Sequence, residues 1–406
     1  MKPVYKLFLE VISSGIRDEL FTDRLNISQE EMRELLFIAE NHKVLPLLYE
    51  TIKDNTSIKN DSLHLSNVIK LKVQQRIRRY HIQRSELLSL LKTIQKHDLD
   101  PIIVKGIICQ ELYPQPFLRL SVDEDFIVDN AEISLFDALL QEIGLHSYFE
   151  TEGEYSYIKP ESPLYIELHR SLFPDNSCIL NDLNKPFTDI KNHISFIHVE
   201  GIQIKTLDPT YHLLFLILHS FKHFIYSGFG IRNLCDIQLF TEKYYKVIDW
   251  KYIEYWSHHF NLDTFISCLY SISRTYLGFK IEGTIPWGLL CEQQAPIDSL
   301  LEDILESGIH GAEDIDRLHS STITLNAFSS HQTHKKRGLL NSIFPTVKQL
   351  KGRYRYLYKF PWLLPVAWFT RGYKYLILSS KKTVSPVRTI EIGKKRTRLL
   401  KKYNII

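Results

Sequence analysis

Short apolar runs and helical patterns alternate along residues 102–169, and this alternation restricts the fold more than any other feature of the chain. β-Branched or aromatic runs predict strands, whereas apolar residues recurring every three or four positions predict helices. We expect strands at residues 102–104, 124–128, 146–150, 155–159 and 164–169. Helices are expected at residues 106–113 and 133–143. Such alternation favours a small α/β domain with a mixed sheet.

Helical patterns flank this domain on both sides. A helix is predicted after Asp208, which can cap it, with Pro209 in its first turn. The hairpin Glu200-Gly201 is predicted to join strands at residues 194–199 and 202–207. The fold class we predict is therefore α+β, a small mixed-sheet domain embedded in helical N- and C-terminal regions. The predicted parts are a helical region at 1–98, the α/β domain at 99–207, a helical domain at 208–310 and an extended tail at 311–406.

Composition excludes several classes of protein. The net charge of +3 over 406 residues is too small to indicate nucleic-acid binding by itself. The five cysteines are scattered, without the paired spacing of a zinc ribbon or a disulfide framework. The N-terminus lacks the apolar core of a signal peptide, and no window reaches the roughly 18 to 20 apolar residues of a membrane span. We expect a cytoplasmic protein with reduced thiols.

Asp123 and Asp125 lie at the start of an apolar strand. Residues two apart on a strand point to the same face, so both carboxylates can converge on one cation. Glu167 lies on a later strand, and three carboxylates on neighbouring strands could bind two metal ions, or one ion beside a base that activates a hydroxyl. The alternative interpretation is a solvated strand end.

Lys105 and Gly106 end one strand and precede a helix. Glycine lets the backbone approach a phosphate, the helix N-terminus favours anions, and lysine adds a positive charge. An ordinary turn is the alternative. Arg119 and Ser121 precede the acids and could contact a triphosphate or position Asp123. Arg119 could equally be a salt-bridge partner that holds the two carboxylates apart.

His212, His219 and His223 share one face of the predicted helix that follows Pro209. A metal site is one interpretation of this face. The interpretation we favour is that the face packs against the α/β domain and closes a cleft, with Lys222, His223 or Arg232 near bound phosphates.

The C-terminal segment contains a basic cluster that follows an aromatic stretch. Such a pattern can bind anionic lipid or nucleic acid, and a solvated terminus is the alternative. The basic residues are Lys381, Lys382, Arg388, Lys394, Lys395, Arg396, Arg398, Lys401 and Lys402, against one acid, Glu391.

Three segments together resemble a family of uncharacterised bacterial nucleotidyltransferases in the polymerase-β-type superfamily. They are residues 103–106 (IVKG), 119–128 (RLSVDEDFIV) and 166–169 (IELH). Phe344-Pro345 and the aromatic stretch near Trp362 resemble the tail of that family. The resemblance implies Asp123, Asp125 and Glu167 as catalytic metal ligands for Mg²⁺ or Mn²⁺. We also expect nucleotide contacts from Lys105, Gly106, Arg119, Ser121 and His169.

The sequence departs from the superfamily pattern in two places. Lys105-Gly106 replaces the usual Gly-Ser turn, and Glu167 stands where many relatives have Asp. The predicted function is a metal-dependent transfer of a nucleoside monophosphate from an NTP to a hydroxyl of an unidentified acceptor. The alternative is a non-catalytic module that binds a nucleotide or a partner protein.

Overall fold

The computed structural model describes the chain apart from residues 24, 26, 56–62, 152–153, 175–179, 282–296, 309–314, 334–346, 351–353, 355, 371–372 and 374–384. Some residues used in the sequence predictions therefore lie outside the described part, namely Cys178, Cys291, Phe344, Pro345, Lys381 and Lys382. In the described part, no helix is both long and apolar enough to cross a membrane.

A five-stranded mixed sheet forms the centre of the α/β region, in the order β1-β2-β5-β4-β3. β2 pairs in parallel with β5, whereas the other neighbours are antiparallel. This confirms the predicted α+β class with a mixed sheet. The elements are β1 (Ile102–Val104), α6 (Gly106–Gln110), η1 (Pro116–Leu118), β2 (Glu124–Ile127), α7 (Ile133–Glu142), β3 (His146–Thr151), β4 (Glu154–Ile158) and β5 (Tyr165–His169).

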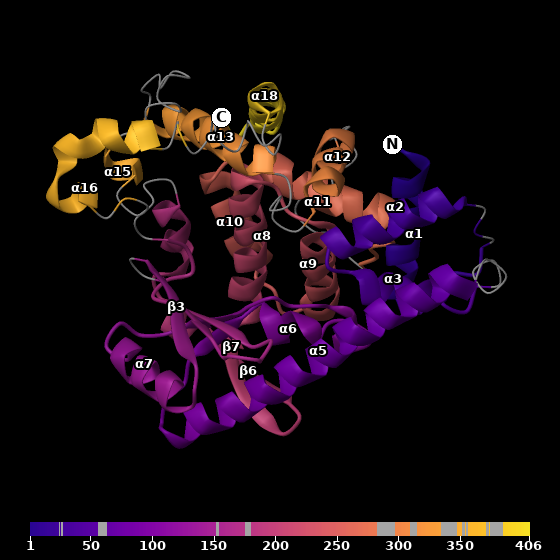
Figure 1. Cartoon of the computed structure of the whole chain (residues 1–406), viewed down its shortest axis with the longest axis horizontal. Helices are drawn as coiled ribbons and strands as arrows, with labels where there is room; N and C mark the ends of the chain where they lie inside the picture. The colour runs from indigo at the N-terminus through magenta and orange to yellow at the C-terminus, as the bar shows by residue number, and fades with distance from the viewer. Residues whose placement is uncertain are drawn as a thin grey trace.

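The two faces of the sheet have different roles. Phe126 of β2 and Leu168 of β5 pack in an apolar core with α7 and the end of the long helix α5. The alternate residues of the same strands face the helical body, where α8 lies over the sheet (Figure 1). The N-terminal helices are α1 (Pro3–Ile16), α2 (Gln29–Asn41), α3 (Leu45–Ile52) and α5 (Leu63–Lys96).

The hairpin predicted around Glu200-Gly201 is present and lies beside the sheet, where the Thr206 hydroxyl donates to the Ile103 carbonyl over 2.6 Å. It follows η2 (Asn181–Phe187) and η3 (Ile190–Asn192) and consists of β6 (Ile194–Val199) and β7 (Ile202–Leu207). The helices that follow are α8 (Pro209–Tyr226), α9 (Ile231–Tyr244), α10 (Trp250–His259), α11 (Asp263–Tyr276) and α12 (Ile297–Ser307). As predicted, the Asp208 side chain caps α8 by accepting from the Tyr211 backbone N–H.

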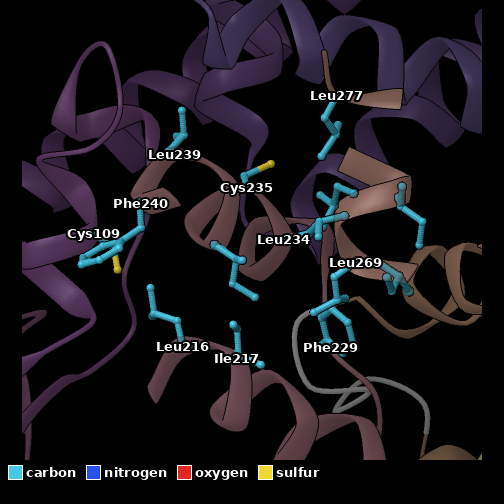
Figure 2. Close-up of a cluster of buried hydrophobic side chains, with 14 of the residues drawn as sticks. Cys109, Leu216, Ile217, Phe229, Leu234, Cys235, Leu239, Phe240, Leu269 and Leu277 are labelled. Carbon is cyan, nitrogen blue, oxygen red and sulfur yellow. The ribbon is translucent and has the colours of Figure 1, made fainter. Parts of the chain in front are cut away.

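The larger apolar core joins the sheet region to these helices. Figure 2 shows Cys109 of α6 gathered with Leu216 of α8 and with Leu234 and Phe240 of α9. Because α8 and α9 are packed on the sheet domain through this core, polar side chains on their sheet-facing sides are held close to β2 and β5.

The prediction of an extended tail over residues 311–406 is wrong for two segments, α13 (Ile315–Thr333) and α18 (Pro386–Lys402), which are helices packed together. Arg396 of α18 is buried and donates to the carbonyls of Phe224 and Tyr226 at the end of α8. Asp316 accepts from Thr389, which fixes the start of α18. These contacts join residues distant in sequence, so local patterns could not predict them. Shorter elements lie between, at α15 (Val347–Leu350), α16 (Tyr356–Lys359) and η5 (Pro361–Leu363).

Candidate active site

All eight residues predicted for the site line one cavity of about 370 Å³ between the sheet and helices α8 and α9. Its volume is in the range of small-molecule pockets. The eight are Lys105, Gly106, Arg119, Ser121, Asp123, Asp125, Glu167 and His169. Helices α8 and α9 contribute His219, Lys222, His223 and Arg232 to the same lining, in agreement with the predicted packing of that helix face against the α/β domain.

Asp125 and Glu167 form the centre of the cavity wall. They are direct register partners on the parallel strands β2 and β5, so both side chains point to the same face. His169, two residues further along β5, places Nε2 3.1 Å from Asp125 Oδ1 and 3.3 Å from Glu167 Oε2. The second oxygen of Asp125 is 2.6 Å from Lys105 Nζ. Asp125 is therefore held between two cationic groups.

Charge pairing dominates the electrostatics of this cluster. Burial opposes ionisation of Asp125, but Lys105 and His169 lower its pKa below the usual value. Burial likewise disfavours charge on His169, yet its bonds to Asp125 and Glu167 raise its pKa to about 9. The pKa of Glu167 is raised, chiefly by burial. At neutral pH the cluster contains a protonated His169 and a carboxyl, Glu167, that takes up a proton more readily than an exposed glutamate.

The same residues can hold a divalent cation. One donor atom each from Asp125, Glu167 and His169 lie within 4.8 Å of one another, the only such group found in the described part of the chain. Carboxylate oxygens suit Mg²⁺, and imidazole suits transition metals. The donor set fits a metal once His169 has lost its proton, because only the neutral ring can be a ligand, and the charge of the cation would then replace that of His169 beside Asp125.

Asp123 lies just before β2 and is half-buried on the cavity wall. It is outside the close donor group of Asp125, Glu167 and His169. Its backbone carbonyl accepts a hydrogen bond from the Ser121 hydroxyl over 2.9 Å, so Ser121 shapes the turn that brings Asp123 to the cavity. Asp123 lines the cavity together with the other predicted residues, and its role as a metal ligand stays a prediction.

Lys105 adopts a strained backbone conformation, with φ 55° and ψ −120°. Its N–H donates to His212 Nε2 over 3.4 Å, and Thr206 Oγ1 is 3.3 Å from His212 Nδ1. Burial lowers the pKa of His212 to about 3, so this ring is a neutral acceptor. His212 thus supports the turn. None of His212, His219 and His223 belongs to the close donor group of Asp125, Glu167 and His169, and this argues against a three-histidine metal site.

Glu124, which the sequence analysis did not assign to the site, lies behind the Lys105-Gly106 turn. Its carboxylate accepts from the Ile107 N–H over 2.9 Å, and burial raises its pKa to about 8. A Cβ added to Gly106 would lie 1.9 Å from Glu124 Oε2. The alternation of faces along β2 was the signal for this position, since Glu124 points away from Asp125.

We predict that Gly106→Ala destabilises the protein, because the new methyl group must displace the buried Glu124 carboxyl. Gly144→Ala is the matched control, since Gly144 also has a positive φ but no atom within 4 Å of the added Cβ. We expect Gly106→Ala to cost about 1–3 kcal/mol more than Gly144→Ala in urea-induced unfolding. Equal costs for the two variants would show that the close approach to Glu124 is unimportant.

Arg119 lines the cavity but has a structural partner. Its guanidinium forms two bonds to Asp236 of α9, at 2.9 and 2.8 Å, and a third to the Gly106 carbonyl at 3.3 Å. The Tyr113 hydroxyl also donates to Asp236, over 2.9 Å. Arg119 is thus a salt-bridge partner, but of Asp236 and not of the paired carboxylates on β2, and it ties the turn at Gly106 to α9.

The geometry can now be compared with known proteins. A family described as uncharacterised nucleotidyltransferase matches residues 28–278, more than half of the chain. The chain belongs to this nucleotidyltransferase family. The match includes β1 to β5, all eight predicted site residues and the helices α8 to α11, and it leaves α12 to α18 outside. No curated protein and no solved structure matches the chain. Membership of the family supports a role in nucleotidyl transfer and confirms the resemblance inferred from the three sequence segments.

Proposed function

We propose that the protein transfers a nucleoside monophosphate from an NTP to a hydroxyl group of an acceptor, with a divalent cation at Asp123, Asp125 and Glu167. The observation that carries this proposal is the pairing of Asp125 with Glu167 across β2 and β5 in a cavity of nucleotide-binding size. When bound, Mg²⁺ or Mn²⁺ would neutralise phosphate charge and lower the pKa of the acceptor hydroxyl.

The chain's own residues account for the remaining requirements of the reaction. The acceptor oxygen forms a bond to the α-phosphorus, while the bond from that phosphorus to the bridging oxygen breaks and pyrophosphate leaves. Glu167, whose pKa burial raises, would take the proton of the acceptor hydroxyl. Lys222 and Arg232, on the helical wall of the cavity, would bind the phosphate oxygens.

Calorimetry with a non-hydrolysable analogue of each NTP, with and without Mg²⁺, tests the proposal on the intact chain. We expect at least one analogue to bind, and to bind more tightly when Mg²⁺ is present. Binding of no analogue under either condition would exclude the proposed activity.

The alternative is a binding module that has lost catalysis, and two observations favour it. Both oxygens of Asp125 are engaged, by Lys105 and by His169, and the turn at Lys105-Gly106 is not the Gly-Ser turn of the superfamily. If this alternative holds, an NTP binds without Mg²⁺ dependence, and no pyrophosphate is released when cell extract supplies acceptors.

Lys222 leads to a separate prediction. Among the described residues, it is the basic side chain of the cavity wall that forms neither a hydrogen bond nor an ion pair. Burial, and then repulsion from Lys105, lower its pKa, so an anion that pairs with it relieves both effects. We expect Lys222→Met to weaken NTP binding about 10- to 100-fold while Mg²⁺ binding is retained. Lys251→Met, at an exposed position on α10, is the control. Unchanged NTP affinity in Lys222→Met would remove Lys222 from the phosphate site.

A further inference from the structure

Residues 356–370, which we call the aromatic arm, comprise α16, η5 and a helical stretch at residues 364–370. Figure 1 shows this region at the end of the molecule opposite α1, α2 and α3. The arm shares a small apolar core with α15, in which Leu363, Leu364 and Trp368 pack against Leu350, Leu357 and Ala367. This core accounts for one face of the arm.

The other face of the arm is apolar and exposed. Trp362 is 72% exposed and Phe369 78% exposed, and Val366 between them is also exposed. Val366 and Phe369 lie three residues apart, on one face of the helical stretch, and Trp362 lies in η5 just before it. Exposed apolar clusters of this kind usually mark a binding surface. The core of the arm does not explain these side chains, because Trp362, Val366 and Phe369 are not among its residues.

The charge around the arm indicates what this face binds. Between Asp316 and Glu391 the chain contains fourteen Lys and Arg residues and no Asp or Glu, although the net charge of the whole chain is only +3. The side chain of Lys359, at the start of this face, is accessible to solvent. No charged residue occurs between Lys359 and Arg371, so an uncharged aromatic run is flanked by cations. In the sequence, therefore, the arm is bordered by positive charge, which is complementary to an anionic surface. Arg317 is an exception, since it is buried and pairs with Asp303.

The C-terminal helix is a weaker candidate for the same role. Lys395 of α18 pairs with Glu302 and Glu306, and Arg396 is buried against carbonyls of α8. Part of the basic cluster predicted from the sequence is thus used within the fold. The aromatic arm, by contrast, combines exposed apolar side chains with basic flanks.

We propose that the aromatic arm attaches the protein to the surface of an anionic lipid bilayer. Trp362 and Phe369 would enter the boundary between headgroups and acyl chains, while the neighbouring lysines and arginines contact anionic headgroups. An aliphatic residue, Val366, between the two aromatic side chains fits acyl chains better than stacked nucleic-acid bases. The attachment is peripheral, because it uses one exposed face. This proposal is independent of the catalytic one.

Flotation of the full-length protein with lipid vesicles tests the attachment. We expect binding to vesicles of phosphatidylcholine mixed with phosphatidylserine, weaker binding at high salt, and little binding to phosphatidylcholine alone. Trp362→Ala together with Phe369→Ala should weaken binding by about tenfold or more, because two inserted side chains are lost. Phe37→Ala is the matched control, since Phe37 on α2 is also exposed, at 62%.

Three outcomes would overturn the proposal. One is the absence of binding to the anionic vesicles, and another is equal binding by the double variant and wild type. The third is that the protein does not bind vesicles but binds DNA or RNA, or self-associates in sedimentation experiments, and that the double variant loses this interaction. Thermal unfolding of each variant checks that these exposed substitutions leave the fold intact.

Discussion

Replacing Asp125 with asparagine is expected to abolish pyrophosphate release and the Mg²⁺ dependence of NTP binding. Asp125 is the acid that β2 places opposite Glu167, and its carboxylate joins Lys105 to His169. An amide carries no net charge to hold a divalent cation, so we expect the rate to fall by a factor of about 10³ or more. The measurement is pyrophosphate release from NTP in cell extract supplemented with the purified protein.

Asp129→Asn is the matched control for this experiment. Asp129 lies just beyond β2, is exposed and pairs with Lys191, so its substitution removes the same charge outside the cavity. We expect wild-type turnover from Asp129→Asn. A folded Asp125→Asn protein with undiminished, Mg²⁺-dependent turnover would refute the proposed role, and circular dichroism establishes whether the variant is folded.

Two further substitutions, for which the binding of Mg²⁺ is measured, identify the metal ligands. Because Mg²⁺ prefers oxygen donors, Asp123→Asn should reduce Mg²⁺ binding nearly as much as Asp125→Asn, whereas His169→Asn should retain most of it. The opposite order would assign a ligand to His169 and would favour a transition metal, since His169 belongs to the close donor group and Asp123 does not.

The secondary structure of the sheet region could be predicted closely from the sequence. The strand expected at residues 102–104 is β1, and the strand expected at 164–169 is β5, which begins one residue later. Local patterns suffice here, because a strand with one buried and one polar face requires apolar and polar residues to alternate along the sequence. The same alternation predicted that Asp123 and Asp125 point to one face, and both line the cavity. It predicted neither the strand order nor the parallel pairing of β2 with β5, which bring Asp125 and Glu167 together.

The partners of the site residues could not be predicted, because each is a contact between distant segments. Lys105 was assigned to phosphate, and in the structure its ammonium group pairs with Asp125. Burial by itself would lower the pKa of Lys105, but the carboxylates of Asp125 and Asp123 more than offset this and raise it. Sequence spacing gives the type of residue at a site, whereas the charge state of that residue depends on neighbours contributed by other strands and helices.

Arg119 illustrates the same limit and leads to the largest stability effect that we expect. Arg119 and Asp236 are 2% and 4% exposed, and Arg119→Met would leave the Asp236 carboxylate buried with only the Tyr113 hydroxyl as a donor among its described contacts. Removing one partner of a buried, doubly bonded ion pair costs about 3–5 kcal/mol in free energy of unfolding. Urea denaturation followed by circular dichroism measures this cost. Arg119→Lys should recover only part of it, because lysine cannot form the two-bond contact.

The double variant Arg119→Met with Asp236→Leu separates the charge from the packing. We expect it to be more stable than Arg119→Met alone, because no buried carboxylate remains without its partner. The control is Lys191→Met, which breaks an ion pair of 2.7 Å between exposed side chains and should change stability little. If Arg119 instead served the nucleotide alone, Arg119→Met would keep the urea midpoint of wild type and change only the affinity for NTP. A lowered midpoint therefore distinguishes a residue that fixes the turn at Gly106 from one that contacts the substrate.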